Sequence, residues 1–171
     1  MRFLRDAVLT ILLLLVVAAV FGYVLTRNGL SASAEPPRLE ALVAGQIRRL
    51  AIPSHAAQQK NPLVGDPNAW AQGGKVFVDE CAVCHGDDGR GKSTVGRNLY
   101  PKVPDMSLAD TQRWSDGELY FIIFNGVRYT GMPAWGSEHS PEEIWRLVSY
   151  IRRMPKLTPE DLEKVGPFAG Q

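Results

Sequence analysis

The pentapeptide Cys81-Ala82-Val83-Cys84-His85 constrains this chain more than any other feature of its sequence. Two thiols at C-x-x-C spacing, followed directly by a histidine, form the pattern of covalent haem attachment. The thiols can add to the two vinyl groups of a haem as thioethers, and the histidine then lies under the iron as a nitrogen ligand. The two cysteines are the only ones among 171 residues, so no disulfide competes for them.

Two other kinds of site use C-x-x-C pairs, and the sequence disfavours both. A thioredoxin-like redox pair requires a β-α-β context, and the chain has no strand pattern of any strength. A structural zinc site requires further cysteines or histidines at ligand spacing. We therefore predict one covalent haem c, with its iron, attached through Cys81 and Cys84 and ligated by His85.

The sixth iron ligand is predicted to be Met132, which follows His85 by 47 residues. It lies in a Gly- and Pro-rich stretch, Gly131-Met132-Pro133, that is typical of a loop. The intervening chain is long enough to pass round a haem and return on its other face. Met106, Met154, His55 and His139 are the alternatives. The two methionines are expected to fill the core, as buried methionines ordinarily do, and His55 is expected in a solvated loop.

Haem propionates need hydrogen-bond donors when they are partly buried. The candidates near the predicted methionine loop are the indole N–H of Trp135, Arg128 and Tyr129, with Trp114 further upstream. For the two tryptophans the alternative is plain core packing, and for Arg128 it is a solvated surface charge.

Three helices are predicted around the motif. The first begins near Asp66-Pro67-Asn68 and runs into the cysteines, with the small Gly73 allowing another helix to approach closely. The second follows the capping box at Ser115 to Glu118 and ends at Asn125-Gly126. The third follows a capping box from Ser140 to Glu143 and ends at Pro155. The long connection from residue 86 to residue 113 is expected to wrap the haem.

Apolar residues fill the segment from Ala7 to Leu25, which is 19 residues long and near the length that spans a bilayer. Arg2 and Arg5 precede it, so its amino end is expected in the cytoplasm and the rest of the chain outside. A cleaved signal peptide is the alternative, because Ala32-Ser33-Ala34 offers a cleavage site. The apolar run exceeds the usual ~7–15 residues of a signal core, which favours a retained anchor.

Three parts of the chain are predicted: an anchor over residues 1–27, a linker over residues 28–65 and a haem domain over residues 66–171. Within the linker, Leu39, Leu42, Val43, Ile47 and Leu50 recur on one face of a short helix. This amphipathic helix either packs on its own domain or lies on the membrane or a partner subunit. The sequence leaves these alternatives open.

Residues 66–155 resemble the class I c-type cytochromes, in particular membrane-anchored, mono-haem bacterial members. The markers are Gly73, Phe77, the motif with Gly86, the run Gly131-Met132-Pro133-Ala134-Trp135, and Tyr150. The resemblance implies an all-α fold of three to five helices around one covalent haem with His/Met ligation. It also implies that a proline carbonyl accepts the second ring N–H of the histidine. Pro101 is our first choice for that proline and Pro104 the second.

Function is expected to be one-electron transfer, not catalysis. No nucleophile–base pair or carboxylate pair stands out, and iron held by both His85 and Met132 has no open position for oxygen or peroxide. The expected partners are a redox donor and acceptor of a periplasmic or membrane respiratory chain, and the expected location is the outer side of a bacterial cytoplasmic membrane. An electron-transfer subunit of a larger respiratory or dehydrogenase complex is the first alternative, and a peroxidase-like or sensing haem protein is the second.

The charge balance favours no nucleic-acid partner. The whole chain has a formal net charge of +1, and residues 60–171 carry 13 lysines and arginines against 15 aspartates and glutamates. Because this charge is small, docking onto a redox partner is expected to depend on a local patch and not on long-range attraction.

Overall fold

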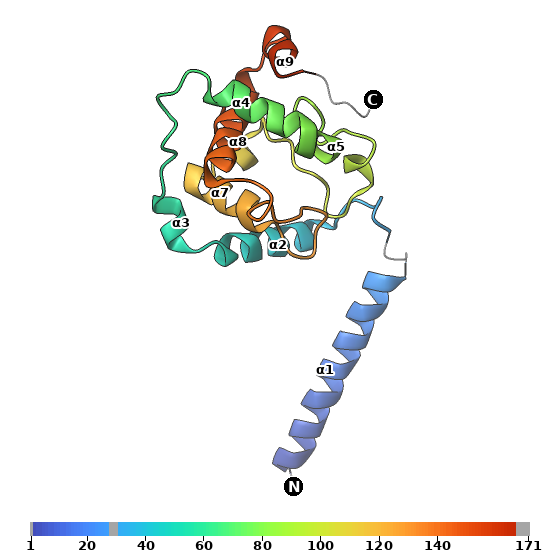
Figure 1. Ribbon diagram of the computed structural model, residues 1–171. Coiled ribbons are helices and arrows are strands. Elements are labelled where there is room, and N and C mark those ends of the chain that lie inside the picture. The colour runs from blue at the N-terminus through green and yellow to red at the C-terminus, as the bar shows by residue number, and fades with distance from the viewer. Residues whose placement is uncertain (1, 28–30, 167–171) are drawn as a thin grey trace. The chain divides into compact units, whose positions relative to one another are not determined.

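The computed structural model describes residues 2–27 and 31–166, and every regular element in those residues is helical (Figure 1). The predicted all-α fold is therefore confirmed. The chain forms two compact units, residues 1–32 and residues 33–171, which are described separately. Residues 28–30 of the predicted linker and residues 167–171 of the predicted haem domain lie outside the described part.

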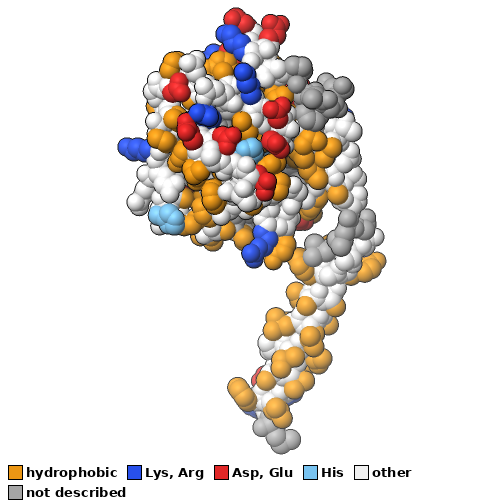
Figure 2. Space-filling view, in the orientation of Figure 1, with side chains coloured by type: hydrophobic (Ala, Val, Ile, Leu, Met, Phe, Trp, Pro, Cys, Tyr) orange, Lys and Arg blue, Asp and Glu red, His pale blue; other side chains and the backbone are white. Residues whose placement is uncertain are grey.

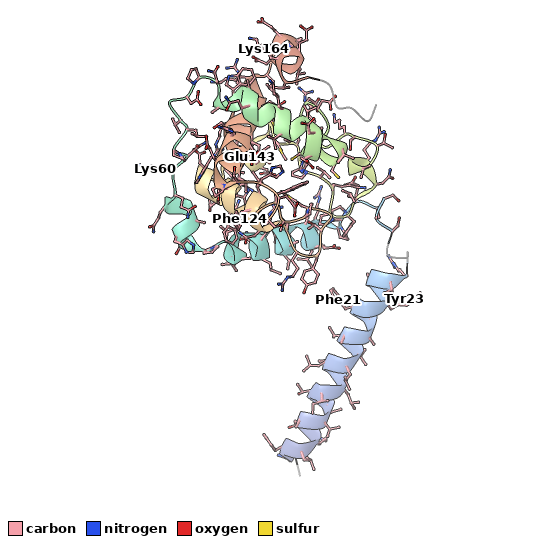
Figure 3. The ribbon with its side chains drawn as sticks, viewed as in Figure 1. Phe21, Tyr23, Lys60, Phe124, Glu143 and Lys164 are labelled. Carbon is pink, nitrogen blue, oxygen red and sulfur yellow. The ribbon has the colours of Figure 1, made fainter. Side chains whose placement is uncertain are left out.

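The first unit is a single helix, α1 (Arg2–Thr26). Its stretch Arg2–Val24 is long and apolar enough to cross a membrane. Residues 11–17 are consecutive, apolar and exposed, so hydrophobic side chains lie on every side of the helix. Figure 2 shows them along the face in view. Phe21 and Tyr23 project outward from it in the same way (Figure 3). A helix that is apolar all round suits lipid, and α1 is the membrane anchor of the chain.

The core of the second unit forms where α4 (Ala69–Val76) crosses α8 (Pro141–Arg153). A Cβ atom on Gly73 would lie 2.0 Å from the carbonyl oxygen of Arg146, so only glycine permits this crossing. The predicted close approach of another helix at Gly73 is confirmed. Beside it, the rings of Phe77 and Tyr150 lie 5.2 Å apart and both are fully buried.

The chain reaches the cysteine motif without leaving helical structure. α4 continues through one turn of π-helix (Phe77–Cys81) into α5 (Ala82–His85). π-helical turns of this kind occur often at functional sites. Gly86, with φ of +75°, then ends α5.

Both predicted capping boxes are present. Ser115 and Glu118 exchange hydrogen bonds at the start of α7 (Asp116–Asn125), and Ser140 and Glu143 do so at the start of α8. α8 ends at Arg153, where a 3₁₀ turn over Met154–Lys156 takes up Pro155. Each box satisfies backbone N–H groups that the helix itself leaves unpaired.

Five further elements complete the second unit. They are α2 (Arg38–Ala51), α3 (Ser54–Gln58), a 3₁₀ turn (Gly96–Asn98), α6 (Ala109–Gln112) and α9 (Pro159–Val165). The segment between α3 and α4 is fastened by Asn61, whose side chain donates to the carbonyl oxygen of Trp145 and to Ser149 Oγ at 3.0 and 2.9 Å. Residues 33–65, predicted as a linker, thus belong to the same compact unit as the haem domain.

Candidate haem site

A cavity of about 370 Å³ opens inside the second unit, a volume typical of cofactor sites at about 300–1,000 Å³. Four segments supply most of its lining: residues 77–85 of the motif helix, the loop over residues 99–106, the inner face of α7, and the loop over residues 127–133. The α7 residues are Leu119, Ile122 and Ile123. Most of the lining side chains are apolar.

The two cysteines and the histidine of the motif all line this cavity. Cys81 and Cys84 are both half-buried free thiols. Burial, together with the nearby charges of Glu80 and Cys84, raises the pKa of the Cys81 thiol to about 12. The sulfurs are therefore held as neutral thiols against an apolar space, in position to react with a group that fills it.

His85 has the properties of a metal ligand. Its side chain is buried, and its Nδ1 atom has no hydrogen-bond partner in the described part of the chain. Burial also lowers the pKa of the imidazole to about 4. The ring is thus neutral at pH 7, and a neutral imidazole is the form that binds iron. These residues fit a covalently attached haem.

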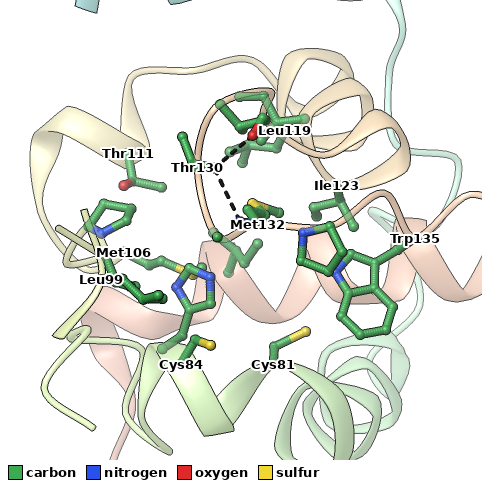
Figure 4. A pocket seen from close by; sticks show the side chains of 18 of the residues that line it. Cys81, Cys84, Leu99, Met106, Thr111, Leu119, Ile123, Thr130, Met132 and Trp135 are labelled. Carbon is green, nitrogen blue, oxygen red and sulfur yellow. Dashed lines mark hydrogen bonds between the residues drawn. The ribbon is translucent and has the colours of Figure 1, made fainter. Parts of the chain in front are cut away.

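Met132 lies on the wall of the cavity across from Cys81 and Cys84 (Figure 4). Its backbone is held by a small turn. The N–H of Met132 donates to Thr130 Oγ1 at 3.1 Å, and its carbonyl oxygen accepts from the N–H of Val127 at 3.2 Å. Thr130 Oγ1 in turn donates to the carbonyl oxygen of Val127 at 2.7 Å. The backbone of Met132 is therefore held by hydrogen bonds within its own loop.

The other methionines and histidines divide into one that meets the cavity and several that do not. Met106 is buried and lines the cavity, so it is the second methionine within it. Met154 is buried beyond the lining, where its sulfur would lie 2.4 Å from a Cβ atom on Gly89. His55 is exposed on α3, and the His139 ring packs on Trp135 at 5.5 Å. The structure thus leaves Met132 and Met106 as the two sulfur candidates.

The predicted propionate donors also divide into residues that line the cavity and residues that do not. Trp114 and Trp135 line the cavity, whereas Arg128 and Tyr129 are exposed and do not. They occupy the tip of the turn that Thr130 and Val127 close, so their side chains point into solvent. The structure does not bring Arg128 to the site.

Two cations that the sequence analysis did not select do line the cavity: Arg48 of α2 and Lys102. The Arg48 guanidinium lies 5.9 Å from the centre of the Trp114 ring. The Lys102 ammonium group donates to the carbonyl oxygens of Ser33 and Arg97. A signal for Arg48 existed, because it is on the side of the amphipathic helix opposite Leu39, about 180° away at 3.6 residues per turn.

Pro101 and Pro104 both line the cavity with His85, and the peptide bond between Tyr100 and Pro101 is cis. No hydrogen bond joins His85 Nδ1 to either proline in the described residues. The role of Pro101 as an acceptor therefore stays a prediction.

Comparison with known proteins matches this part of the chain to one family. Residues 68–151 match the model described as "Cytochrome C oxidase, cbb3-type, subunit III". The cbb3-type cytochrome c oxidase subunit FixPc of Rhizobium leguminosarum bv. viciae is 28% identical over 123 residues, which are 72% of this chain and 40% of that protein. The cbb3-type cytochrome c oxidase subunit CcoP of Rubrivivax gelatinosus is 35% identical over 100 residues, 57% of this chain and 31% of that protein.

A relative with a different name is similar over a stretch of comparable length. The thiosulfate dehydrogenase of Stutzerimonas stutzeri is 27% identical over 100 residues, which are 55% of this chain and 32% of that protein. The chain thus spans well under half the length of the relatives it matches. The cysteine motif and Met132 both fall inside the matched residues 68–151.

Proposed function

We propose, on the premise that this chain belongs to the c-type cytochromes, that it carries single electrons between redox partners at a membrane. One observation supports this more than any other. A single cavity is lined by Cys81, Cys84 and His85, and Met132 lies across it from the two cysteines. This is the donor set that a covalent haem with two axial protein ligands requires.

The haem c supplies a one-electron ferric/ferrous couple when bound. The two cysteines hold it covalently. His85 would offer a neutral ring nitrogen to the iron and Met132 would offer a thioether, and a thioether favours the ferrous state relative to a second histidine. Because the methionine loop is closed by its own hydrogen bonds, both ligands can keep one geometry in both oxidation states. The apolar cavity wall excludes water.

The charged edge of the haem is proposed to lie toward Arg48, Lys102 and Trp114. These three side chains bring two cations and an indole to the cavity. The Arg48 guanidinium and Lys102 ammonium groups match the charge of two propionates. Arg48 takes the place that the sequence analysis gave to Arg128.

The partner is proposed to be a membrane respiratory complex. Several relatives are named as subunits of cbb3-type cytochrome c oxidase, and α1 is a membrane anchor. We place the haem domain on the periplasmic side, because Arg2 and Arg5 precede the apolar run. We further propose that α1 is retained. The chain would then act as an electron-transfer subunit of such a complex or as a tethered carrier that serves it.

The axial ligands can be tested by substituting each sulfur candidate. We expect Met132→Ala to remove the weak long-wavelength band of methionine-ligated ferric haem and to lower the reduction potential by on the order of 0.1 V. Met106→Leu is the matched control, because Met106 also lines the cavity, and it should keep the band. The reverse result would assign the sixth ligand to Met106.

The same Met132→Ala protein separates electron transfer from the peroxidase-like alternative. Wild-type protein should neither bind cyanide readily nor turn over peroxide, and the variant should bind cyanide. Peroxide turnover by the wild type would contradict a pure carrier.

Covalent attachment is tested by haem staining of the protein band on a denaturing gel. We expect the staining to be lost in the double variant Cys81→Ala, Cys84→Ala.

A further inference from the structure

α2 is oriented opposite to the usual helix of a water-soluble domain. Its apolar residues Leu39, Leu42, Val43, Ile47 and Leu50 expose 46–85% of their surface, and none of the residues of the helix is buried. Its polar residues make its contacts with the rest of the second unit. The Tyr100 hydroxyl donates to a Glu40 carboxylate oxygen, and the guanidinium groups of Arg48 and Arg49 lie 5.9 and 5.8 Å from the centre of the Trp114 ring.

The helical geometry places Arg48 opposite the apolar residues and Arg49 at the edge of their stripe. At about 100° per residue, the five apolar positions fall within about 140° of the helix circumference, centred near Leu50. Arg48 lies about 160° from that centre. Of the two half-buried residues of the helix, Gly45 lies about 140° from that centre, and Glu40 lies about 80° from it, at the edge of the stripe. The apolar stripe therefore has no cover among the described residues.

We propose that the apolar face of α2 lies on the surface of the lipid bilayer, with the haem domain held on its polar face. An amphipathic helix with one apolar stripe and low overall hydrophobicity is the type that binds in the plane of a membrane interface. The occupant of the stripe is lipid acyl chain at the headgroup boundary, and this inference rests on the proposed retention of α1.

Chain length supports lipid over a distant protein surface. α1 ends at Thr26 and α2 begins at Arg38, so 11 residues connect them. Fully extended, they span at most about 40 Å. A helix on so short a tether stays close to the bilayer at an effective concentration near the millimolar scale. Even a weak interfacial affinity is then sufficient to keep α2 on the surface.

The polar contacts of α2 give this docking a consequence for the haem site. Arg48 lines the cavity, so the helix that lies on the membrane also forms part of the cavity edge. Docking α2 would fix the orientation of the cavity relative to the bilayer, which a flexible tether alone does not do. Since the Arg48 and Arg49 side chains are turned toward Trp114, docking should depend on apolar area much more than on anionic lipid.

The test uses full-length haem-loaded protein in phosphatidylcholine vesicles, with one spin label at a time. Leu42→Cys and Ile47→Cys place labels on the apolar face, and Ala44→Cys is the control on the exposed opposite side. The native cysteines are occupied by haem, so only the introduced thiol reacts. Labels at 42 and 47 should relax mainly with lipid-soluble oxygen, and the label at 44 mainly with a water-soluble nickel chelate. Adding anionic phosphatidylglycerol should change this pattern little.

A second measurement does not depend on labels. Amide hydrogen exchange in α2 should slow at least about tenfold in vesicles for the wild type relative to the Leu42→Gln, Ile47→Gln double variant, because a 14-residue helix is marginal without packing. Both substituted residues are exposed, so the haem spectrum should be unchanged.

Equal access of the nickel chelate to all three labels in vesicles would overturn the proposal. Labels at 42 and 47 that are exposed in vesicles but shielded from both relaxants in native membranes would show that a protein covers the face instead. Either result would leave the haem assignment untouched, and the mass of the purified protein separately reports whether α1 was retained.

Discussion

Gly126 and Pro133 lie in direct backbone contact: a Cβ atom on Gly126 would stand 2.5 Å from the carbonyl carbon of Pro133. Gly126 ends α7 with φ of +65°, a conformation that other residues rarely adopt. The chain after Met132 then returns along the end of the same helix. The N–H groups of Trp135 and Gly136 donate to the carbonyl oxygens of Ile123 and Phe124 at 3.2 and 2.9 Å. The end of α7 and the methionine loop are therefore one structural unit.

Gly126→Ala should consequently act on the iron ligand although residue 126 does not line the cavity. The methyl group has no room and the left-handed backbone is strained, at a cost of about 1–3 kcal/mol. We expect the methionine loop to shift, with a weaker methionine–iron band, a lower reduction potential and faster binding of imidazole. Gly65→Ala is the control, because a Cβ atom there would meet nothing within 4 Å. A stability loss without any change in the band would contradict this coupling.

The crossing of α4 and α8 makes a second glycine prediction with its own control. Gly73→Ala places a methyl group within 2.0 Å of the Arg146 carbonyl oxygen, so the helices must separate or distort. We expect a loss of about 2–4 kcal/mol in the free energy of unfolding, as for other overpacked or disrupted cores. Gly45→Ala sits in exposed helix α2 with open space around it and should gain about 0.5–1 kcal/mol of helix stability. Urea unfolding should therefore show a decrease in the free energy of unfolding for Gly73→Ala and an increase for Gly45→Ala.

Burial of His85 predicts a pH dependence of stability. Burial lowers the pKa of His85 in the folded protein from 6.5 to about 4. Between these two pH values the unfolded chain is protonated at His85 and the folded chain is not. Stability is therefore full above about pH 6.5 and falls toward pH 4, by about 3 kcal/mol from this residue alone. Iron bound to the ring acts in the same direction. Urea midpoints measured between pH 7 and about pH 4 check it, with His55→Gln as a control that should show the same profile. A flat midpoint across that range would contradict the burial argument.

The sequence predicted those parts of the fold that local rules govern. The capping boxes at Ser115 and Ser140 depend on residues three positions apart. The small size of Gly73 is enough to indicate that another helix packs closely against it. The apolar run of α1 is equally a local property. Each of these features can be read without knowing what lies across the structure from it.

The rest depended on contacts between distant segments. Arg128 was selected because it is near Met132 in sequence, but the hydrogen bonds of Thr130 turn its side chain outward. Arg48 was treated as part of a linker helix, yet it lines the cavity together with Trp114, 66 positions later. The sequence showed that α2 is amphipathic but not which face meets the domain. Contacts of long polar side chains determine which face packs on the domain, and the spacing of apolar residues carries no information about those contacts.

The anchor supplies the last prediction, which concerns how fast electrons reach a membrane partner. The second unit has little net charge, so long-range attraction adds little to its encounter rate. A tether substitutes for attraction by keeping the domain near the millimolar scale at the membrane. Removing residues 1–32 leaves the compact unit 33–171 and its cavity intact, so the haem spectrum and reduction potential should hardly change. At micromolar protein, however, reduction or oxidation by native membranes should slow on the order of a hundredfold or more, and excess truncated protein should restore the rate. Equal rates for the two proteins at equal low concentration would mean that α1 serves assembly or export and not delivery.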